Sequence, residues 1–400
     1  MKTQIFNNSI GEAANIILSG GLCAVPTETV YGIACNGLDE NAVDKIYSVK
    51  GRPSIKPLSL MVSDVSSIEK YCRTVPNQAL LLAKKFWPGP LTIVLKAKKE
   101  VVPAIVRANG DTVGLRCPQN DLTLQLLREA GVPFAAPSAN PSGLPSPLDA
   151  EMVVNYFDGK IDAVIDGGKC EFSRESTIID MSSEPYRILR QGALQSDEIY
   201  DELVNGMTII GISSGTGCGK TTALNEFKKV GALCIDCDEV YHSLLNGCEE
   251  MINEILFSFP NAAVNGVIDR KILGSVVFSN DDALKRLNSI THRYVAYEVM
   301  KKLRYFALNG GNIAVIDAVE LFESGINKLC SFTLGIISRE ENRINRIMLR
   351  DGIDREYACK RIHAQKDDAY YRKHCTYIIE NNDSECEFIK NINQLIKEKV

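Results

Sequence analysis

Two patterns of apolar and polar positions divide the chain. Up to residue 205, short apolar segments typical of strands alternate with stretches whose apolar positions recur at helical spacing. The strand-like segments lie at 22–25, 91–95, 112–116, 164–165 and 177–179, and the helix-like ones at 10–19 and 122–130. This mixture predicts an α/β fold.

The second pattern begins after a short acidic helix predicted at 197–204, which ends at Asn205-Gly206, a typical helix stop. An apolar strand follows at 207–212, then a glycine-rich loop, a helix and further strands at 233–235 and 313–316. This alternation predicts a parallel sheet with helices on both faces. We therefore expect two domains, residues 1–205 and 207–400, as the length of 400 residues also favours.

Composition limits the partners and the location. The net charge is −5, and neither half is basic: 20 Lys and Arg stand against 24 Asp and Glu up to residue 205, and 25 against 26 after it. A nucleotide or tRNA contact therefore requires a local basic pocket. No apolar run reaches the length of a signal peptide or a membrane span, so we expect a cytoplasmic protein without membrane contact.

The thirteen cysteines are scattered. Cys234 and Cys237 form the one close pair, and none of the four histidines pairs with it in sequence to suggest a zinc site. Reduced, buried thiols are the interpretation that fits a cytosolic protein.

The glycine-rich loop of the second half carries a phosphate-binding motif. Gly219-Lys220-Thr221 follows a strand and opens a helix, the context that a P-loop requires, although Ser214 stands where the strict pattern has glycine. Main-chain amides of such a loop bind phosphates, the lysine adds charge, and the threonine hydroxyl, here Thr221, binds Mg²⁺. The residues expected to bind ATP are Gly215, Thr216, Gly217, Cys218, Gly219, Lys220, Thr221 and Thr222.

Two further features lie near this loop. Asp236 and Asp238 follow the strand at 233–235, where a carboxylate can accept a hydroxyl proton or help to hold Mg²⁺. Cys218 lies close to a helix N-terminus, which can lower the pKa of a thiol and make it redox-sensitive. The alternative for Cys218 is a small residue that simply fits.

The second half resembles dephospho-CoA kinase. The matching segments include Gly-Thr-Gly-Cys-Gly-Lys-Thr, Ile-Asp-Cys-Asp-Glu-Val, Leu-Phe-Glu and Asn-Arg-Ile-Met-Leu-Arg-Asp-Gly. The resemblance implies ATP-dependent phosphorylation of dephospho-CoA, with Lys220 and Asp238 as catalytic residues and Asp238 as the base. It also implies a lid that carries Arg346, Arg350 and Arg361. Val319-Glu320-Leu321 replaces the family's Pro-Leu-Leu, His242 an arginine and Arg293 a proline, so a changed acceptor or low activity is expected.

Before residue 205 there is neither histidine nor P-loop, and three other features stand out. In Pro26-Thr27-Glu28-Thr29, which follows a predicted strand, the two threonines stand two residues apart. The segment 50–56 packs Lys50, Arg52 and Lys56 into seven residues. The segment 137–143 is rich in small and hydroxyl residues, which permit close approach of a ligand. Together they predict a pocket for a polyanion and a small polar ligand.

Residues 5–204 resemble the YrdC-like threonylcarbamoyl-AMP synthase family. The motifs that carry the resemblance are Pro-Thr-Glu-Thr-Val-Tyr-Gly, Lys-Gly-Arg-Pro-Ser-Ile-Lys-Pro-Leu, Ala-Pro-Ser-Ala-Asn-Pro-Ser-Gly, Glu-Ser-Thr-Ile-Ile-Asp and Leu-Arg-Gln-Gly-Ala. The resemblance implies a twisted mixed sheet with helices, and a reaction of L-threonine, bicarbonate and ATP that yields threonylcarbamoyl-AMP and pyrophosphate. The product feeds the tRNA threonylcarbamoyl transfer machinery. Ser173 stands where the family often has glycine.

The resemblance also assigns roles to individual residues. Lys50, Arg52 and Lys56 are catalytic and bind ATP, and Thr27 and Arg116 bind threonine. The remaining ATP-binding residues are Thr112, Ser138, Asn140, Ser176 and Arg190. One alternative is that the first half binds RNA and does not catalyse a reaction. The second half has its own alternative, a kinase for nucleotides or other small molecules.

Overall fold

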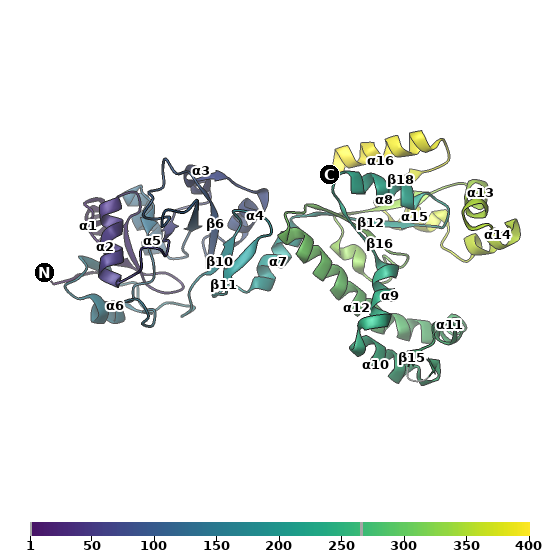
Figure 1. The fold of residues 1–400 in the computed structure, drawn as a ribbon, viewed down its shortest axis with the longest axis horizontal. Helices are drawn as coiled ribbons and strands as arrows, with labels where there is room; N and C mark the ends of the chain where they lie inside the picture. The colour runs from purple at the N-terminus through teal and green to yellow at the C-terminus, as the bar shows by residue number, and fades with distance from the viewer. Residues whose placement is uncertain (1, 265–266) are drawn as a thin grey trace. The chain divides into compact units, whose positions relative to one another are not determined.

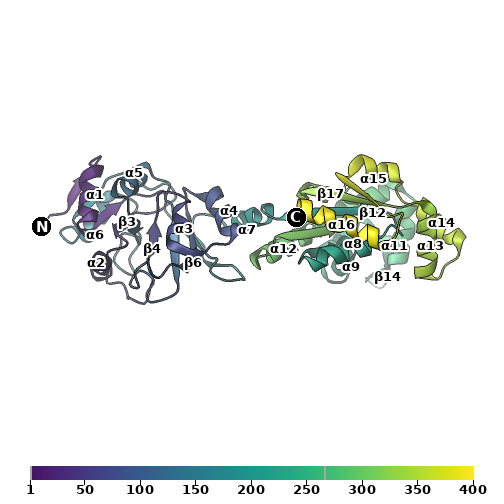
Figure 2. The same cartoon turned by 90° about the horizontal axis from the view of Figure 1, so that it is seen from above.

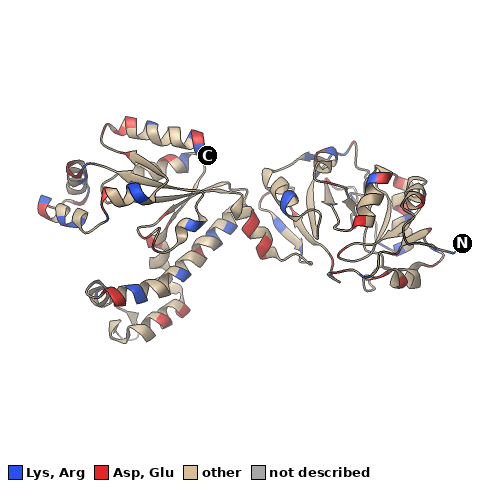
Figure 3. Cartoon of the chain, turned by 180° about the vertical axis from the view of Figure 1, so that it is seen from behind, with Lys and Arg blue, Asp and Glu red and all other residues tan. Residues whose placement is uncertain are grey.

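The computed structural model describes residues 2–264 and 267–400, apart from the side chain of Phe278. These residues form two compact units: one reaches to Gly206 and includes Leu308–Gly310, and the other holds the rest. The α/β fold expected for both halves is confirmed. Figure 3 shows charges of both signs spread over the helices of each unit.

The first unit is built on a mixed sheet. Its strands are β1 (Gln4–Phe6), β2 (Cys23–Val25), β3 (Gly32–Asn36), β4 (Ser59–Met61), β5 (Cys72–Thr74), β6 (Leu91–Ala97), β7 (Thr112–Arg116), β8 (Phe134–Ala135), β9 (Ala163–Ile165), β10 (Thr177–Asp180) and β11 (Arg187–Arg190). The strand order is β1-β9-β2-β3-β8-β4-β7-β6-β10-β11, with β5 paired to β6. Strands β6 and β10 are parallel, and β7 is antiparallel to β6. The end of β7 therefore lies beside the starts of β6 and β10.

Helices surround this sheet. They are α1 (Ile10–Leu18), α2 (Glu40–Lys50), α3 (Ser67–Tyr71), α4 (Asn77–Phe86), α5 (Asp121–Ala130), α6 (Ala150–Phe157) and α7 (Ser196–Asn205). Helix α2 matters for the site because Lys50 is its last residue. Asp39 caps its start by accepting from the amides of Asn41 and Ala42, and Gly51 ends it in the left-handed region at φ 58°. These local signals fix where the basic segment 50–56 begins.

The second unit contains a sheet in which all strands are parallel. It consists of β12 (Thr208–Ser214), β13 (Leu233–Asp236), β16 (Ile313–Asp317), β17 (Phe332–Ile337) and β18 (Tyr377–Glu380), in the order β13-β16-β12-β17-β18. Asp236 pairs in register with Asp317, so both carboxylates lie at the carboxyl edge of the sheet. A small antiparallel pair joins β14 (Ala263–Val264) and β15 (Val267–Ile268).

Helices cover this sheet and extend beyond it. They are α8 (Lys220–Lys229), α9 (Cys237–Gly247), α10 (Glu249–Ser258), α11 (Arg270–Phe278), α12 (Asp281–Leu308), α13 (Glu340–Asp351), α14 (Arg355–His363), α15 (Asp368–His374) and α16 (Glu385–Lys399), with 3-10 turns η1 (Pro260–Ala262) and η2 (Ile326–Leu329). Figures 1 and 2 show α8 and α16 side by side, and Figure 1 shows α12 across the sheet from them.

The core of the second unit lies under α8 and α16. Phe227 of α8 and Phe388 and Ile392 of α16 are buried against Ile212 and Leu334 of the sheet. A separate apolar cluster joins α9, α10, α11 and α12. Among the residues that the structure describes, no helix combines the length and apolar character that a membrane crossing needs.

Candidate functional sites

A cavity of about 190 Å³ opens in the first unit where β7 ends and β6 and β10 begin. Three arginines from different parts of the chain, Arg52, Arg116 and Arg190, contribute to its wall. The full lining is Val30, Tyr31, Gly32, Arg52, Pro57, Leu58, Ser59, Met61, Thr92, Arg116, Ala136, Pro137, Ser138, Glu175, Ser176, Ile178 and Arg190. Three guanidinium groups with hydroxyls between them suit an anionic ligand such as a phosphate or a carboxylate.

Arg116, the last residue of β7, is held by buried partners. Its Nη2 lies 2.8 Å from Glu28 Oε1, and the two side chains are 8% and 2% exposed. The same nitrogen donates to the Thr29 hydroxyl at 2.9 Å. Glu28 Oε1 has no aligned hydrogen-bond donor, so its contact with Arg116 is an ion pair, while Oε2 accepts from the amide of Gln119 at 3.0 Å. Glu28 therefore fixes the guanidinium at the cavity wall.

Arg190 and Ser176 form the opposite polar wall. Arg190 Nε donates to the Ser176 carbonyl at 3.0 Å and Nη2 donates to the Ser176 hydroxyl at 3.1 Å. That hydroxyl also lies 2.9 Å from the hydroxyl of Thr92. Arg190 Nη1 contacts Glu175, and burial is the main cause that lowers the pKa of Arg190. A ligand anion at this point competes with Glu175 for the guanidinium.

The basic segment 50–56 is only partly turned toward the cavity. Lys50 is 4% exposed and its ammonium donates to the carbonyls of Ser138 and Asn140, which ties the end of α2 to the segment 137–143. Burial, with Arg52 nearby, lowers the pKa of Lys50 to about 8. Arg52 lines the cavity and donates to the Pro57 carbonyl at 2.9 Å. Lys56 lies on the exposed part of the segment and does not line the cavity.

Like Lys50 and Lys56, three further expected residues do not reach the wall of this cavity. Thr112 begins β7 and pairs with Lys96, so about 13 Å of strand separates it from Arg116. Thr27 is buried and its hydroxyl donates to the Val30 carbonyl at 2.6 Å, closing a turn. Asn140 Oδ1 accepts from the Ser138 hydroxyl at 2.6 Å. Thr27 and Asn140 therefore shape the loops, and Thr112 stands away from the cavity.

In the second unit, the P-loop encloses a cavity of about 350 Å³. The loop joins β12 to α8, and Gly217 and Gly219 adopt φ values of 79° and 104°, which favour glycine. The lining is Ser214, Gly215, Thr216, Gly217, Cys218, Gly219, Lys220, Thr221, Val319, Arg346, Arg350 and Gln365. Lys220 Nζ lies 2.7 Å from Asp317 Oδ1. Thr222 is in the first turn of α8 but outside the lining.

The arginines of α13 approach this loop from one face of the helix. Arg346 Nη1 donates to the Gly217 carbonyl at 3.2 Å, and Arg350 lines the cavity. Arg343, which the sequence reasoning missed, is 5% exposed and its Nε donates to the Thr216 carbonyl at 2.9 Å. Arg343, Arg346 and Arg350 stand at positions i, i+3 and i+7, which puts them on one face of a helix. This spacing is the sequence signal that could have revealed Arg343.

The structure bears on two further expectations for this unit. Burial raises the pKa of the Cys218 thiol, which favours the interpretation of a small residue that fits over that of an activated cysteine. The helix N-terminus does not outweigh the loss of solvation of a thiolate that is 1% exposed. Arg361 forms an ion pair with Asp351 and does not line the P-loop cavity.

A second cavity of about 350 Å³ adjoins the P-loop cavity, and Val319 lines both. Asp238, in the first turn of α9, lies in its wall, and Asp236 caps that helix. Burial, and then the neighbouring Asp236, raise the pKa of Asp238. A hydroxyl bound in this cavity near Asp238 is therefore next to the phosphate-binding loop.

Comparison with known proteins agrees with the resemblances expected for the two halves. The Sua5/YciO/YrdC family model, described as telomere recombination, matches residues 15–192, and the dephospho-CoA kinase family model matches residues 208–387. A threonylcarbamoyl-AMP synthase of Pyrococcus abyssi is 47% identical over 187 residues, 47% of this chain and 55% of the relative. A putative threonylcarbamoyl-AMP synthase of Methanocaldococcus jannaschii is 41% identical over 178 residues, 44% of this chain and 83% of the relative.

A solved structure of dephospho-CoA kinase from Campylobacter jejuni is 27% identical and covers 48% of this chain and 96% of its own, with a TM-score of 0.36. The two family models together indicate a fusion of two transferase families. The chain belongs to the Sua5/YciO/YrdC family through its N-terminal half, and its C-terminal half matches the dephospho-CoA kinase family model. Both resemblances expected from the motifs are confirmed. The chain spans about half the length, 55%, of the first curated relatives that it matches.

Proposed function

We propose that the N-terminal half makes threonylcarbamoyl-AMP from L-threonine, bicarbonate and ATP and releases pyrophosphate. The observation that carries the proposal is the convergence of Arg52, Arg116 and Arg190 on one cavity that also presents the hydroxyls of Ser176 and Thr92. The reaction needs such a site, because every substrate in it is anionic or carries a carboxylate. The product would go to the tRNA threonylcarbamoyl transfer machinery.

The chemistry runs through a carbamate. The amine of threonine and bicarbonate give N-carboxythreonine and water. A carbamate oxygen then attacks the α-phosphorus of ATP, and pyrophosphate leaves with the electrons of the broken P–O bond. Arg52 and Arg190 stabilise the charge that builds on the phosphate oxygens, and Arg116 takes the threonine carboxylate. Lys56 is exposed, and we infer that it contacts the phosphates once ATP is bound.

Loop positioning supplies the rest of the catalysis. Lys50 ties the end of α2 to the segment 137–143, and Thr27 closes the turn that presents Thr29 to Arg116. Fixing the groups in this way lowers the entropic cost of bringing three substrates together.

For the C-terminal half we propose ATP-dependent phosphorylation of dephospho-CoA. Main-chain amides of residues 215–221 and Lys220 hold the phosphates, and Arg346 and Arg350 stabilise the transferring group. Asp238 accepts the proton of the attacking ribose hydroxyl from the adjoining cavity, a role that its raised pKa suits.

The residues at the P-loop fit a Mg²⁺ ion. Thr221 lines the cavity, and Asp317 and Asp236 lie at the same edge of the sheet. Mg²⁺ prefers few oxygen ligands from the protein, with waters and phosphates completing its shell. Such an ion would neutralise phosphate charge.

One experiment tests each half. For the first, pyrophosphate release from ATP is measured with and without threonine and bicarbonate and without RNA. Arg52→Ala should lower turnover about 100-fold if the guanidinium stabilises the transition state. Lys160→Ala, which removes an exposed cation far along the chain from the cavity segments, is the control. Release that does not depend on threonine would refute the proposal.

For the second half, transfer of labelled phosphate from ATP to a panel of acceptors is measured. Dephospho-CoA should be labelled, and Lys220→Ala should abolish the transfer. Labelling of another small molecule in place of dephospho-CoA would refute dephospho-CoA as the acceptor and still support kinase activity in this half.

A further inference from the structure

Two arginines in the cavity of the first unit each have a carboxylate partner of their own. Arg116 pairs with Glu28, and Arg190 pairs with Glu175. Guanidinium groups that surround one cavity repel one another, and a carboxylate beside a guanidinium offsets that repulsion. The two pairs therefore have the same electrostatic role, and burial and position are what distinguish them.

The two carboxylates differ in how firmly they are held. The Glu28 side chain is buried, and its second oxygen accepts from the amide of Gln119 at 3.0 Å. The side chains of Glu175 and Arg190 are 37% and 40% exposed. A buried ion pair is costly to separate because neither charge regains water, whereas the partners of a half-exposed pair are hydrated again when they part. Glu28 is thus a permanent partner of its arginine, and Glu175 is an exchangeable one.

Glu175 also lies where a ligand anion is expected. It lines the cavity, whereas Glu28 does not. Burial lowers the pKa of Lys50 and of Arg52, and the charge of Glu175 opposes that effect on both groups. Burial likewise lowers the pKa of Arg190, and Glu175 is the first influence that opposes it. One carboxylate therefore acts on three cations of this site, as a bound phosphate would.

The main chain and a second partner define how Glu175 can exchange. Its carbonyl oxygen accepts from the amide of Ala193 at 2.8 Å, and a Cβ on Gly192 would lie only 2.2 Å from that oxygen. The backbone of residue 175 is therefore packed in place, and its side chain alone is free to turn. Oε2 contacts Arg190, while Oε1 accepts from the Ser146 hydroxyl at 3.1 Å. The carboxylate keeps this hydroxyl as a partner when Arg190 binds a ligand.

We propose that Glu175 is a positioning residue of the N-terminal site: it holds Arg190 at the cavity and yields it to a phosphate group of the substrate. The inference rests on the proposed synthesis of threonylcarbamoyl-AMP. A phosphate oxygen that binds Arg190 takes the place of Glu175 Oε2, so one ion pair replaces another. The displaced carboxylate competes for the guanidinium throughout, and its return favours release of the pyrophosphate product. Arg116 keeps its buried partner and undergoes no such exchange.

The test measures binding, so it does not depend on turnover. Inorganic pyrophosphate is titrated calorimetrically into full-length chains that all carry Lys220→Ala, so that differences between them come from the first unit. Glu175→Gln keeps the size of the side chain and removes its charge. It should bind pyrophosphate about fivefold more tightly, the scale of a partly exposed ion pair. A merely structural role for Glu175 predicts weaker binding.

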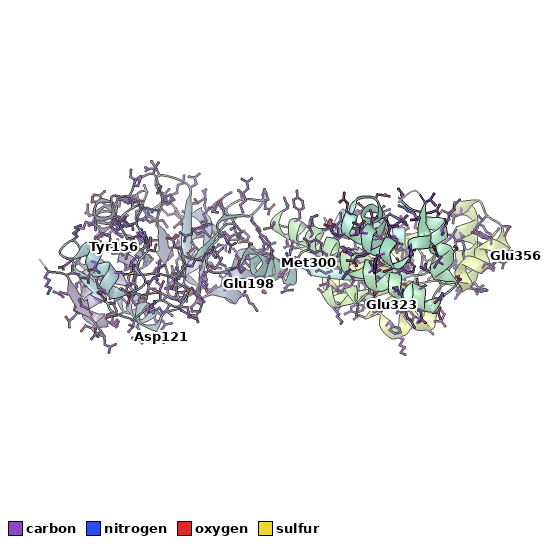
Figure 4. The ribbon with its side chains drawn as sticks, turned by 90° about the horizontal axis from the view of Figure 1, so that it is seen from below. Asp121, Tyr156, Glu198, Met300, Glu323 and Glu356 are labelled. Carbon is purple, nitrogen blue, oxygen red and sulfur yellow. The ribbon has the colours of Figure 1, made fainter. Side chains whose placement is uncertain are left out.

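A control variant and a double variant complete the test. Glu198, labelled in Figure 4, caps α7 by accepting from the Gln195 amide at 3.2 Å and does not line the cavity. Glu198→Gln removes one carboxylate and keeps the capping acceptor, so it should leave the affinity unchanged. In chains that also carry Arg190→Gln, the gain from Glu175→Gln should shrink, because the exchanged partner is absent.

Three results overturn the inference. They are no binding of pyrophosphate to the chain with Glu175 intact, no gain in Glu175→Gln, and an equal gain with and without Arg190. Pyrophosphate release that does not depend on threonine, together with the expected shifts in affinity, refutes the proposed reaction and leaves the exchange at Arg190 standing.

Discussion

Gly215 of the P-loop should not tolerate a methyl group, and the reason lies in Arg343. A Cβ at residue 215 would meet Arg343 Nη2 at 2.4 Å and Cζ at 2.9 Å. Gly215 does not have a positive φ, so alanine there suffers no backbone strain and space alone decides the outcome. The guanidinium is buried and hydrogen-bonded, so making room for the methyl group breaks its contacts.

The structure sets the size of the effect. Moving the guanidinium breaks its bond to the Thr216 carbonyl at 2.9 Å and its contact with Gln365 at 3.3 Å. Hydrogen bonds to a charged group contribute about 1.5–3 kcal/mol, so Gly215→Ala should lower the affinity of the P-loop for ATP by about 10- to 150-fold. Arg343→Gln should also lower this affinity, because the loop loses the same hydrogen bonds.

The double variant separates this reasoning from a general defect of the loop. Once Arg343 is shortened, the methyl group has room, so Gly215→Ala should add little to Arg343→Gln. The assay is calorimetric binding of an ATP analogue to the four chains, whose N-terminal halves are identical. Gly247→Ala, where a Cβ meets nothing within 4 Å, is the control. Additive losses in the double variant would refute the steric argument.

Three further predictions concern the first unit. Its unfolding can be followed by the fluorescence of Trp87, the single tryptophan of the chain. Glu28→Gln leaves the buried Arg116 without its counter-charge and should lower the free energy of unfolding by about 3–5 kcal/mol. Ser173→Gly should raise it by about 1 kcal/mol, because Ser173 has φ 52°, where only glycine is free of strain. Pyrophosphate release should fall as the pH rises through about 8, where the Lys50 ammonium is lost, and Lys50→Arg should move that decline to higher pH.

The sign of the Lys50 effect on stability is opposite to its effect on activity. Its pKa is lowered from 10.5 to about 8 on folding, so between these values the unfolded chain binds more protons. This group therefore makes the folded state more stable as the pH rises through that window. Controls are Ser173→Ala, which should change nothing, and the wild-type unfolding curve at each pH. An activity that stays flat up to pH 10 would exclude Lys50 as a required cation.

Much of the P-loop site follows from a contiguous stretch of sequence. The strand, the glycines and Lys220-Thr221 are neighbours along the chain, and local backbone preferences are enough to form a loop that presents its amides. The same holds for the start and end of α2, which Asp39 and Gly51 set. Ser173 was recognised as a departure, and the positive φ gives its physical reason.

Other features depend on residues far apart in sequence. Arg343 supports the P-loop across 127 positions, and Arg116 meets Thr29 across 87. Periodicity placed Thr112 and Arg116 on one strand but could not say which end of that strand faces a cavity. Burial raises the pKa of the Cys218 thiol and outweighs the opposite effect of the nearby helix N-terminus.

The sequence alone indicated the two families, part of the order of elements and the residue types expected to hold phosphate. Only the tertiary structure shows which of those residues share a cavity. It also shows that His292 and Asn288 contact the Glu320 carboxylate, and that the absence of a side chain at Gly215 leaves space for Arg343. The physical reason is that local motifs depend on backbone preference, whereas the charge and shape of a cavity depend on packing between distant segments.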